Sequence, residues 1–125
     1  MKIRIYYHDT DCGGVVYYAN YLKYMEEART EYFDERGISI KDLASKGVFF
    51  VVARQEIDYK FPAHYADILD VGTRFTKIGQ VKIEVEHEIK NQNGQLICLA
   101  KTIMVCVDSN IRPIAIPEDF RSKII

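Results

Sequence analysis

The stretch HDTDCGGVVYYANYLKYMEEAR, residues 8–29, joins two different hydrophobic patterns. Before it, residues 2–8 alternate between long apolar and polar side chains, which is the period of a half-buried strand. From about Tyr18 the apolar side chains, Leu22 among them, recur at spacings of three and four until Gly37 supplies a C-terminal stop signal. The sequence therefore predicts a strand, a joint rich in polar residues and glycine, and one long helix.

Strand patterns dominate the chain after this helix. A short helix is expected over residues 39–47 with Ser39 as its N-cap, and the tail after Pro113 is expected to run over the surface. The long segments rich in β-branched or aromatic residues are 48–61, 68–78, 81–91 and 95–109. Their short connections favour antiparallel pairing, and NQNG at 91–94 is a strong hairpin signal. Because the long helix must bury its apolar stripe, we expect an α+β fold in which a curved antiparallel sheet wraps around it.

Composition narrows the class of protein. The 125 residues, 48% of them hydrophobic, correspond to a single domain spanning residues 1–125. The 17 Lys+Arg and 18 Asp+Glu nearly cancel, so the broad positive field of nucleic-acid-binding proteins is absent. Three cysteines without the spacing of a zinc site favour free thiols in a reducing compartment. Since no segment approaches the ~18 apolar residues of a membrane span, we expect a cytoplasmic protein.

The joint DTDCGG, residues 9–14, carries more polar and flexible residues than a strand-to-helix connection needs. Its adjacent glycines let the main chain turn sharply and let a ligand approach it closely. The helix start near Tyr18 offers unpaired amides and the positive end of the helix dipole, which suit developing negative charge on a carbonyl oxygen. A nearby aspartate would attack that carbonyl or take a proton from water. A structural role is the alternative, because aspartates beside glycines are ordinary turn and capping residues.

The joint also contains residue types found in cysteine nucleophiles and in metal sites. Cys12 lies beside Asp11, but no histidine is placed by sequence to activate it, so we interpret it as a turn residue and not a nucleophile. His8, Asp9 and Asp11 are metal-ligand types, yet neighbouring residues of a strand point to opposite faces and make a poor cage. We therefore expect no metal site here.

Two segments resemble a known family. Residues 6–33, YYHDTDCGGVVYYANYLKYMEEARTEYF, are similar to the N-terminal signature of the 4-hydroxybenzoyl-CoA thioesterase family of hotdog-fold proteins. Within that family they most resemble the YbgC-type acyl-CoA thioesterases. Residues 57–73, IDYKFPAHYADILDVGT, resemble a strand, Pro-Ala turn and strand of the same family. The resemblance implies the hotdog fold, in which an antiparallel sheet wraps around a long helix, in agreement with the layout expected above.

The resemblance also implies roles for residues of the joint. The second aspartate of the motif DxDxxG is the family's catalytic carboxylate, which is Asp11 here, and the amide of Tyr18 would polarise a thioester carbonyl. The first aspartate, Asp9, is expected to support the turn. YbgC-type proteins usually have a histidine at the position of Tyr18, so a backbone role survives the exchange and an imidazole role does not. The residues expected to contact substrate are Gly14, Val15 and Lys60.

The implied reaction is hydrolysis of an acyl-CoA thioester to a carboxylic acid and free CoA, without a metal or redox cofactor. Asp11 would act as nucleophile or as general base, and the sequence leaves both open. The family's cleft lies between two subunits, which implies at least a homodimer, and such dimers commonly pair into homotetramers. Uncovered edges of a single sheet agree with association between copies.

Alternatives to this function come from the same fold. Hotdog proteins also serve as dehydratases and isomerases of acyl thioesters, and a non-catalytic role in binding acyl carrier protein or an envelope complex is the second alternative. Acyl carrier protein is also the alternative carrier for the hydrolase. The acyl chain's length and character depend on pocket residues from two subunits. The cations considered for the phosphates of CoA are Lys60, Arg54, Lys82, Lys90 and Lys101.

Overall fold

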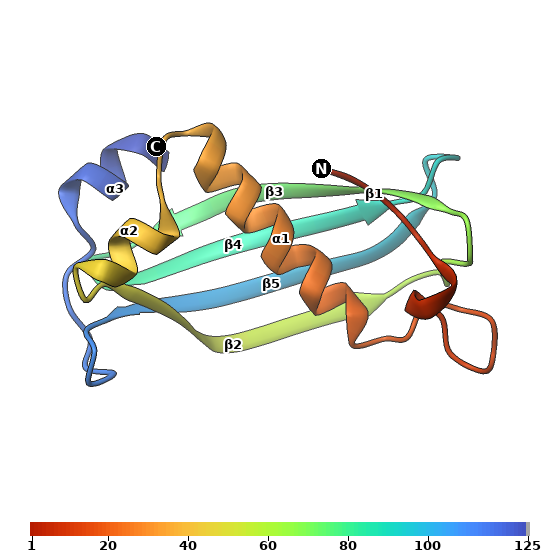
Figure 1. Ribbon diagram of the computed structural model, residues 1–125, viewed down its shortest axis with the longest axis horizontal. Coiled ribbons are helices and arrows are strands. Elements are labelled where there is room, and N and C mark those ends of the chain that lie inside the picture. The colour runs from red at the N-terminus through yellow and green to blue at the C-terminus, as the bar shows by residue number, and fades with distance from the viewer. Residues whose placement is uncertain (125) are drawn as a thin grey trace.

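The computed structural model describes residues 1–124 and shows one antiparallel sheet crossed on one face by a long helix, which confirms the predicted α+β layout (Figure 1). The five strands lie in the order β1-β3-β4-β5-β2, and the sheet is open, with β1 and β2 at its edges. Within residues 1–124 no helix has the length and apolar character needed to span a membrane. The elements in chain order are β1 (Lys2–Arg4), the 3-10 turn η1 (Tyr7–Asp9), α1 (Asn20–Glu35), α2 (Ile40–Ser45), β2 (Phe49–Tyr59), β3 (Ile68–Ile78), β4 (Lys82–Lys90), β5 (Leu96–Val107) and α3 (Glu118–Ile124).

The long strands alternate between a buried and an exposed face, as their sequence period predicts. On β4, Ile83, Val85, His87 and Ile89 are buried, while the glutamates between them are not. The predicted hairpin joins β4 to β5, and Gly94 adopts the positive φ of 75° that its turn requires. One face of the sheet is therefore apolar and available to α1.

Helix α1 buries a stripe against this face. Its buried side chains are Tyr21, Tyr24, Met25, Ala28 and Phe33. The expectation that Leu22 is part of the stripe is wrong, because its side chain is 42% exposed. Residues at i, i+4 and i+7 share a helix face, so Leu22 lies with Glu26 and Arg29 on the side that borders a groove beside β2.

The chain's last segment packs into the core, contrary to the expected surface path. Helix α3 follows Pro117, which suits the first turn of a helix because it lacks an amide hydrogen. Phe120 is 2% exposed, and its ring lies 4.8 Å from the ring of Phe50 and 5.3 Å from that of Phe33. The tail therefore closes the apolar core at the C-terminal end of α1.

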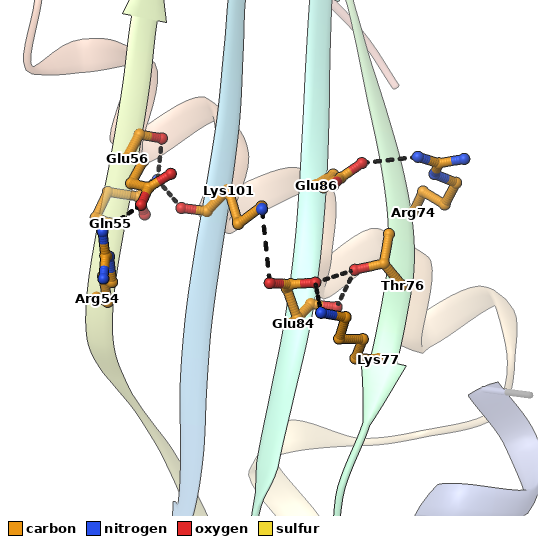
Figure 2. Close-up of polar contacts among 9 residues, drawn as sticks. All are labelled: Arg54, Gln55, Glu56, Arg74, Thr76, Lys77, Glu84, Glu86 and Lys101. Carbon is orange, nitrogen blue, oxygen red and sulfur yellow. Dashed lines mark hydrogen bonds and ion pairs between the residues drawn. The ribbon is translucent and has the colours of Figure 1, made fainter.

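The outer face of the sheet, opposite α1, carries charged residues that pair across neighbouring strands (Figure 2). Arg74 of β3 and Glu86 of β4 are 2.7 Å apart, and Lys101 of β5 lies 3.8 Å from Glu84 of β4. The Thr76 hydroxyl donates to the Glu84 carboxylate at 2.8 Å. In the single chain this face therefore carries charge pairs, and helices α1, α2 and α3 leave it uncovered (Figure 1).

Candidate active site

The joint between β1 and α1 is a closed loop. Thr10 and Val16 form an antiparallel bridge, and inside it the Asp11 amide donates to the Val15 carbonyl at 2.9 Å. The Gly14 amide donates to the Asp11 carbonyl at 3.0 Å. Gly14 has a φ of 80°, which residues other than glycine rarely adopt. The loop holds Asp11 at the molecular surface.

One oxygen of the Asp11 side chain is held and the other is open. Oδ1 accepts a hydrogen bond from the Gly13 amide at 2.8 Å, which fixes the carboxylate relative to the loop. Within residues 1–124, Oδ2 accepts no hydrogen bond. Asp11 is exposed, so Oδ2 is free to meet a ligand.

Asp9 supports the loop, as expected from the first aspartate of the motif. Its Oδ2 accepts from the Tyr6 amide at 2.8 Å, and its side chain is only 14% exposed. Its main-chain carbonyl accepts from the Tyr17 amide and from the Asn20 side chain, at 3.0 and 2.9 Å. Burial raises the pKa of Tyr24, and the nearby Asp9 carboxylate raises it further. Asp9 therefore stabilises the joint through hydrogen bonds to residues on both sides of it.

The amide of Tyr18 is available at the N-terminal end of α1. Helix α1 begins at Asn20, two residues later than the expected start, because the Asn20 amide closes a turn onto the Tyr17 carbonyl at 2.9 Å. Within residues 1–124 the amides of Tyr18 and Ala19 donate to no protein acceptor. The Tyr59 hydroxyl donates to the Tyr18 carbonyl at 3.1 Å and so ties this turn to the end of β2. Two free amides at a helix N-terminus can stabilise an oxyanion.

Exposed aromatic rings surround the joint. Tyr18 contacts Tyr17 and Tyr59, with ring centroids 4.9 and 6.4 Å apart. Tyr7 meets Tyr65 edge to face at 5.9 Å. All five rings are at least 45% exposed. An aromatic surface of this kind is typical of an interface or a ligand surface.

The candidate cations for CoA differ in their pairing. Arg54 lies 2.6 Å from Glu56, Lys90 lies 3.0 Å from Glu88, and Lys101 is paired on the outer face. In the described part of the chain, the side chains of Lys60 and Lys82 form no ion pair. Lys60 directly follows β2 and Tyr59, which brings it to the end of the sheet nearest the joint.

Two hollows were not predicted from the sequence. A groove of about 290 Å³ lies between α1, α2 and the start of β2, and a wider hollow of about 640 Å³ lies on the charged outer face. The groove is mostly apolar, with Glu26 and Arg29 on its wall, and burial lowers the pKa of Arg29. Neither had a signal in the sequence beyond the helix period, because each depends on how separate elements pack. Among residues 1–124 no group of three His, Cys, Asp or Glu side chains is arranged to hold a metal ion.

Comparison with known proteins identifies the family. The family model described as thioesterase-like superfamily matches residues 6–124. The chain belongs to the thioesterase-like superfamily. This thioesterase-like chain is 36% identical over 117 residues to the acyl-CoA thioester hydrolase YbgC of Escherichia coli O6:H1, covering 93% of this chain and 87% of the relative. It is 31% identical over 110 residues to the 1,4-dihydroxy-2-naphthoyl-CoA hydrolase of Synechococcus elongatus, covering 86% and 80%.

Solved structures agree with this membership. The thioesterase-like chain superposes on a 1,4-dihydroxy-2-naphthoyl-CoA thioesterase from Synechocystis with a TM-score of 0.93 and 26% identity, covering 99% of this chain and 93% of that one. A probable thioesterase from Bartonella henselae gives a TM-score of 0.88 with 30% identity, covering 94% and 97%. The hotdog fold implied by the sequence resemblance is therefore confirmed.

Proposed function

We propose that this protein hydrolyses an acyl-CoA thioester to a carboxylic acid and free CoA at the joint between β1 and α1. The observation that supports the proposal most directly is that one loop-to-helix connection carries both the Asp11 carboxylate and the Tyr18 amide. Within residues 1–124, Oδ2 of Asp11 accepts no hydrogen bond and the Tyr18 amide donates none. A carboxylate and an oxyanion site are the two groups that thioester hydrolysis needs. The thioester hydrolases among the relatives point to the same reaction.

The chemistry follows from these two groups. The thioester carbonyl oxygen accepts a hydrogen bond from the Tyr18 amide, and negative charge develops there beside the positive end of α1. In one route Asp11 attacks the carbonyl carbon, CoA leaves as a thiolate that takes up a proton, and water hydrolyses the mixed anhydride. In the other route Asp11 takes a proton from water as that water attacks. In both, the products are the acid and the thiol.

Three further residues complete the proposed substrate contacts. Gly14 leaves open space where a side chain would lie, since no atom is within 4 Å of a Cβ built there. Val15 forms a β-bridge with His64, which ties the loop to the segment before β3. Lys60 lies at the end of β2 with a free ammonium group, which suits a phosphate of CoA.

We propose a homodimer formed through β2. This strand is an edge of the sheet and carries the exposed apolar side chains Phe49 and Val52, 36% and 52% exposed. An unpaired edge with apolar side chains favours antiparallel addition of the same strand from a second copy. A homotetramer would need one more contact, for which the charged outer face of the sheet is a candidate surface. Val52→Lys should shift the assembly to the monomer in light scattering, whereas a change at exposed Lys41 on α2 should not.

The test of the reaction is thioester cleavage across short, long and aromatic acyl-CoAs, comparing the native chain with Asp11→Asn. Loss of thioester absorbance is the readout, because Cys12 is exposed and would react with a thiol dye. Asp11→Asn should lower kcat by about 100-fold or more, the range of a lost catalytic carboxylate. Transfer of oxygen-18 from water into Asp11 during one turnover would identify the covalent route.

A matched control exists at the opposite end of the molecule. Asp108 follows β5 and accepts the amide of the residue two positions later at 2.9 Å, as Asp11 does in its own turn. The two turns lie at opposite ends of the sheet (Figure 1). Asp108→Asn should leave kcat unchanged. Absence of cleavage by the native chain would refute the proposal, and a changed acyl chain with the thioester intact would favour a dehydratase or isomerase.

A further inference from the structure

One main-chain carbonyl connects the two halves of the proposed centre. The carbonyl oxygen of Asp9 accepts from the Tyr17 amide at 3.0 Å and from Nδ2 of Asn20 at 2.9 Å. Asp9 precedes Asp11 by two residues, and Tyr17 directly precedes Tyr18. Together with the Thr10–Val16 bridge, the contacts at this carbonyl therefore help to set the position of the carboxylate relative to the free amide.

Asn20 uses its side chain in an unusual way for its position. It is the first residue of α1, one position after the N-cap, the position at which asparagine usually accepts a hydrogen bond from an amide of the first turn. Here the N-cap is Ala19, which provides no side-chain cap, and the Asn20 side chain donates across eleven positions to Asp9. The Asn20 side chain therefore joins the start of α1 to the segment that leads into the Asp11 loop and does not cap the helix.

Asp9 is also held from its other side. Its carboxylate accepts from the Tyr6 amide, so the residue is restrained at both its side chain and its carbonyl. Of the two donors to that carbonyl, the Tyr17 amide belongs to the main chain and is present in every variant. Asn20 provides the only side-chain donor to this carbonyl among residues 1–124.

We infer that Asn20 is a positioning residue for the hydrolysis, holding the Asp11 loop and the Tyr18 amide at the separation that one thioester carbonyl requires. This inference rests on the proposed function. A displacement of about 1 Å in a reacting group can slow a reaction about 100-fold, while a single hydrogen bond changes stability only modestly. The loss expected from Asn20 therefore falls on kcat far more than on folding.

The experiment measures kcat, KM and thermal unfolding for Asn20→Ala and for Asn20→Leu, which keeps the approximate size of the side chain, removes its donor and adds no charge. Both should lower kcat by about 10- to 100-fold with KM changed less than about threefold. If Asn20→Ala does not fold, the uncharged Asn20→Leu of similar size carries the test.

Asn91→Ala is the matched control for stability. The Asn91 side chain donates to Gln95 and accepts two amides in the β4–β5 hairpin, so its removal takes away more hydrogen bonds than removal of Asn20 does. This variant should keep the native kcat. If kcat falls equally in Asn91→Ala and Asn20→Ala, the loss reflects a general fall in stability. That result would overturn the inference.

A double variant tests whether Asn20 affects kcat through Asp11 or independently of it. If Asn20 acts by placing Asp11, then Asp11→Asn with Asn20→Ala should be no slower than Asp11→Asn alone. Multiplied losses would overturn the inference. If Asp11→Asn retains activity, the proposed function fails as well. If Asp11→Asn is inactive while Asn20→Ala stays within twofold of native kcat, only the positioning role fails.

Discussion

His87 should make this fold sensitive to mild acid. Its side chain lies on the buried face of β4 and is 2% exposed. Nδ1 lies 3.1 Å from the Gly72 carbonyl oxygen and 3.3 Å from the Thr73 hydroxyl, and within residues 1–124 the buried Nε2 has no hydrogen-bond partner. Burial lowers the pKa of His87 to about 4, the charge of Arg29 lowers it too, and the Gly72 contact acts in the opposite direction.

The sign and size of the effect follow from the two states. The unfolded chain binds a proton on His87 as pH falls through about 6.5, whereas the folded chain binds it only near pH 4. Between these values protonation favours the unfolded state, so the free energy of unfolding falls as pH falls and is unaffected by this group above pH 7. Integrated from pH 7 to pH 5, with about 1.36 kcal/mol per pKa unit, the loss is about 2 kcal/mol.

The assay is urea denaturation at a series of pH values and fixed protein concentration, for the native chain and His87→Gln. Other titrating groups act on both chains, so the difference between them isolates His87. The native chain should lose about 2 kcal/mol more than His87→Gln between pH 7 and pH 5. Parallel loss in the native chain and His87→Gln would refute the reasoning.

Three further outcomes are expected. Phe120→Ala should lower the free energy of unfolding by about 3–5 kcal/mol in urea titrations, because a 2% exposed ring leaves a cavity in the core at the α3 end; unchanged stability would mean that α3 does not pack there. In the native state a thiol reagent should label exposed Cys12 alone, with buried Cys98 and Cys106 reacting only in denaturant, since burial raises the pKa of both. Ser39→Ala should cost about 1 kcal/mol, because the Ser39 hydroxyl caps α2 at 3.1 Å, and calorimetry would detect a loss of that size.

Local patterns determined most of the elements. The period of two in the later segments predicted β2 to β5, and the period of three to four predicted α1, because both periods are written in consecutive residues. The N-cap at Ser39 and the hairpin at residues 91–94 were also correct, since each depends on a few neighbouring side chains.

Errors arose where packing between distant segments decides the outcome. The tail after Pro113 has the composition of a surface segment, but Phe120 finds an apolar space between α1 and β2 that exists only in the folded chain. Leu22 fits the helix period and is nevertheless exposed, because the sheet covers only part of that stripe. Such cases depend on which element lies opposite, and a single sequence carries no signal for that.

The site divides in the same way. The sequence by itself determined that an aspartate-rich, glycine-rich joint leads into a helix, because a turn that needs positive φ and a helix start are properties of adjacent residues. Only the tertiary structure decided that Asp9 and Asn20 meet and that, in the part of the chain described, one oxygen of Asp11 and the amide of Tyr18 have no hydrogen-bond partner. Whether such a group meets a partner at hydrogen-bond distance depends on segments that are brought together only when the chain folds.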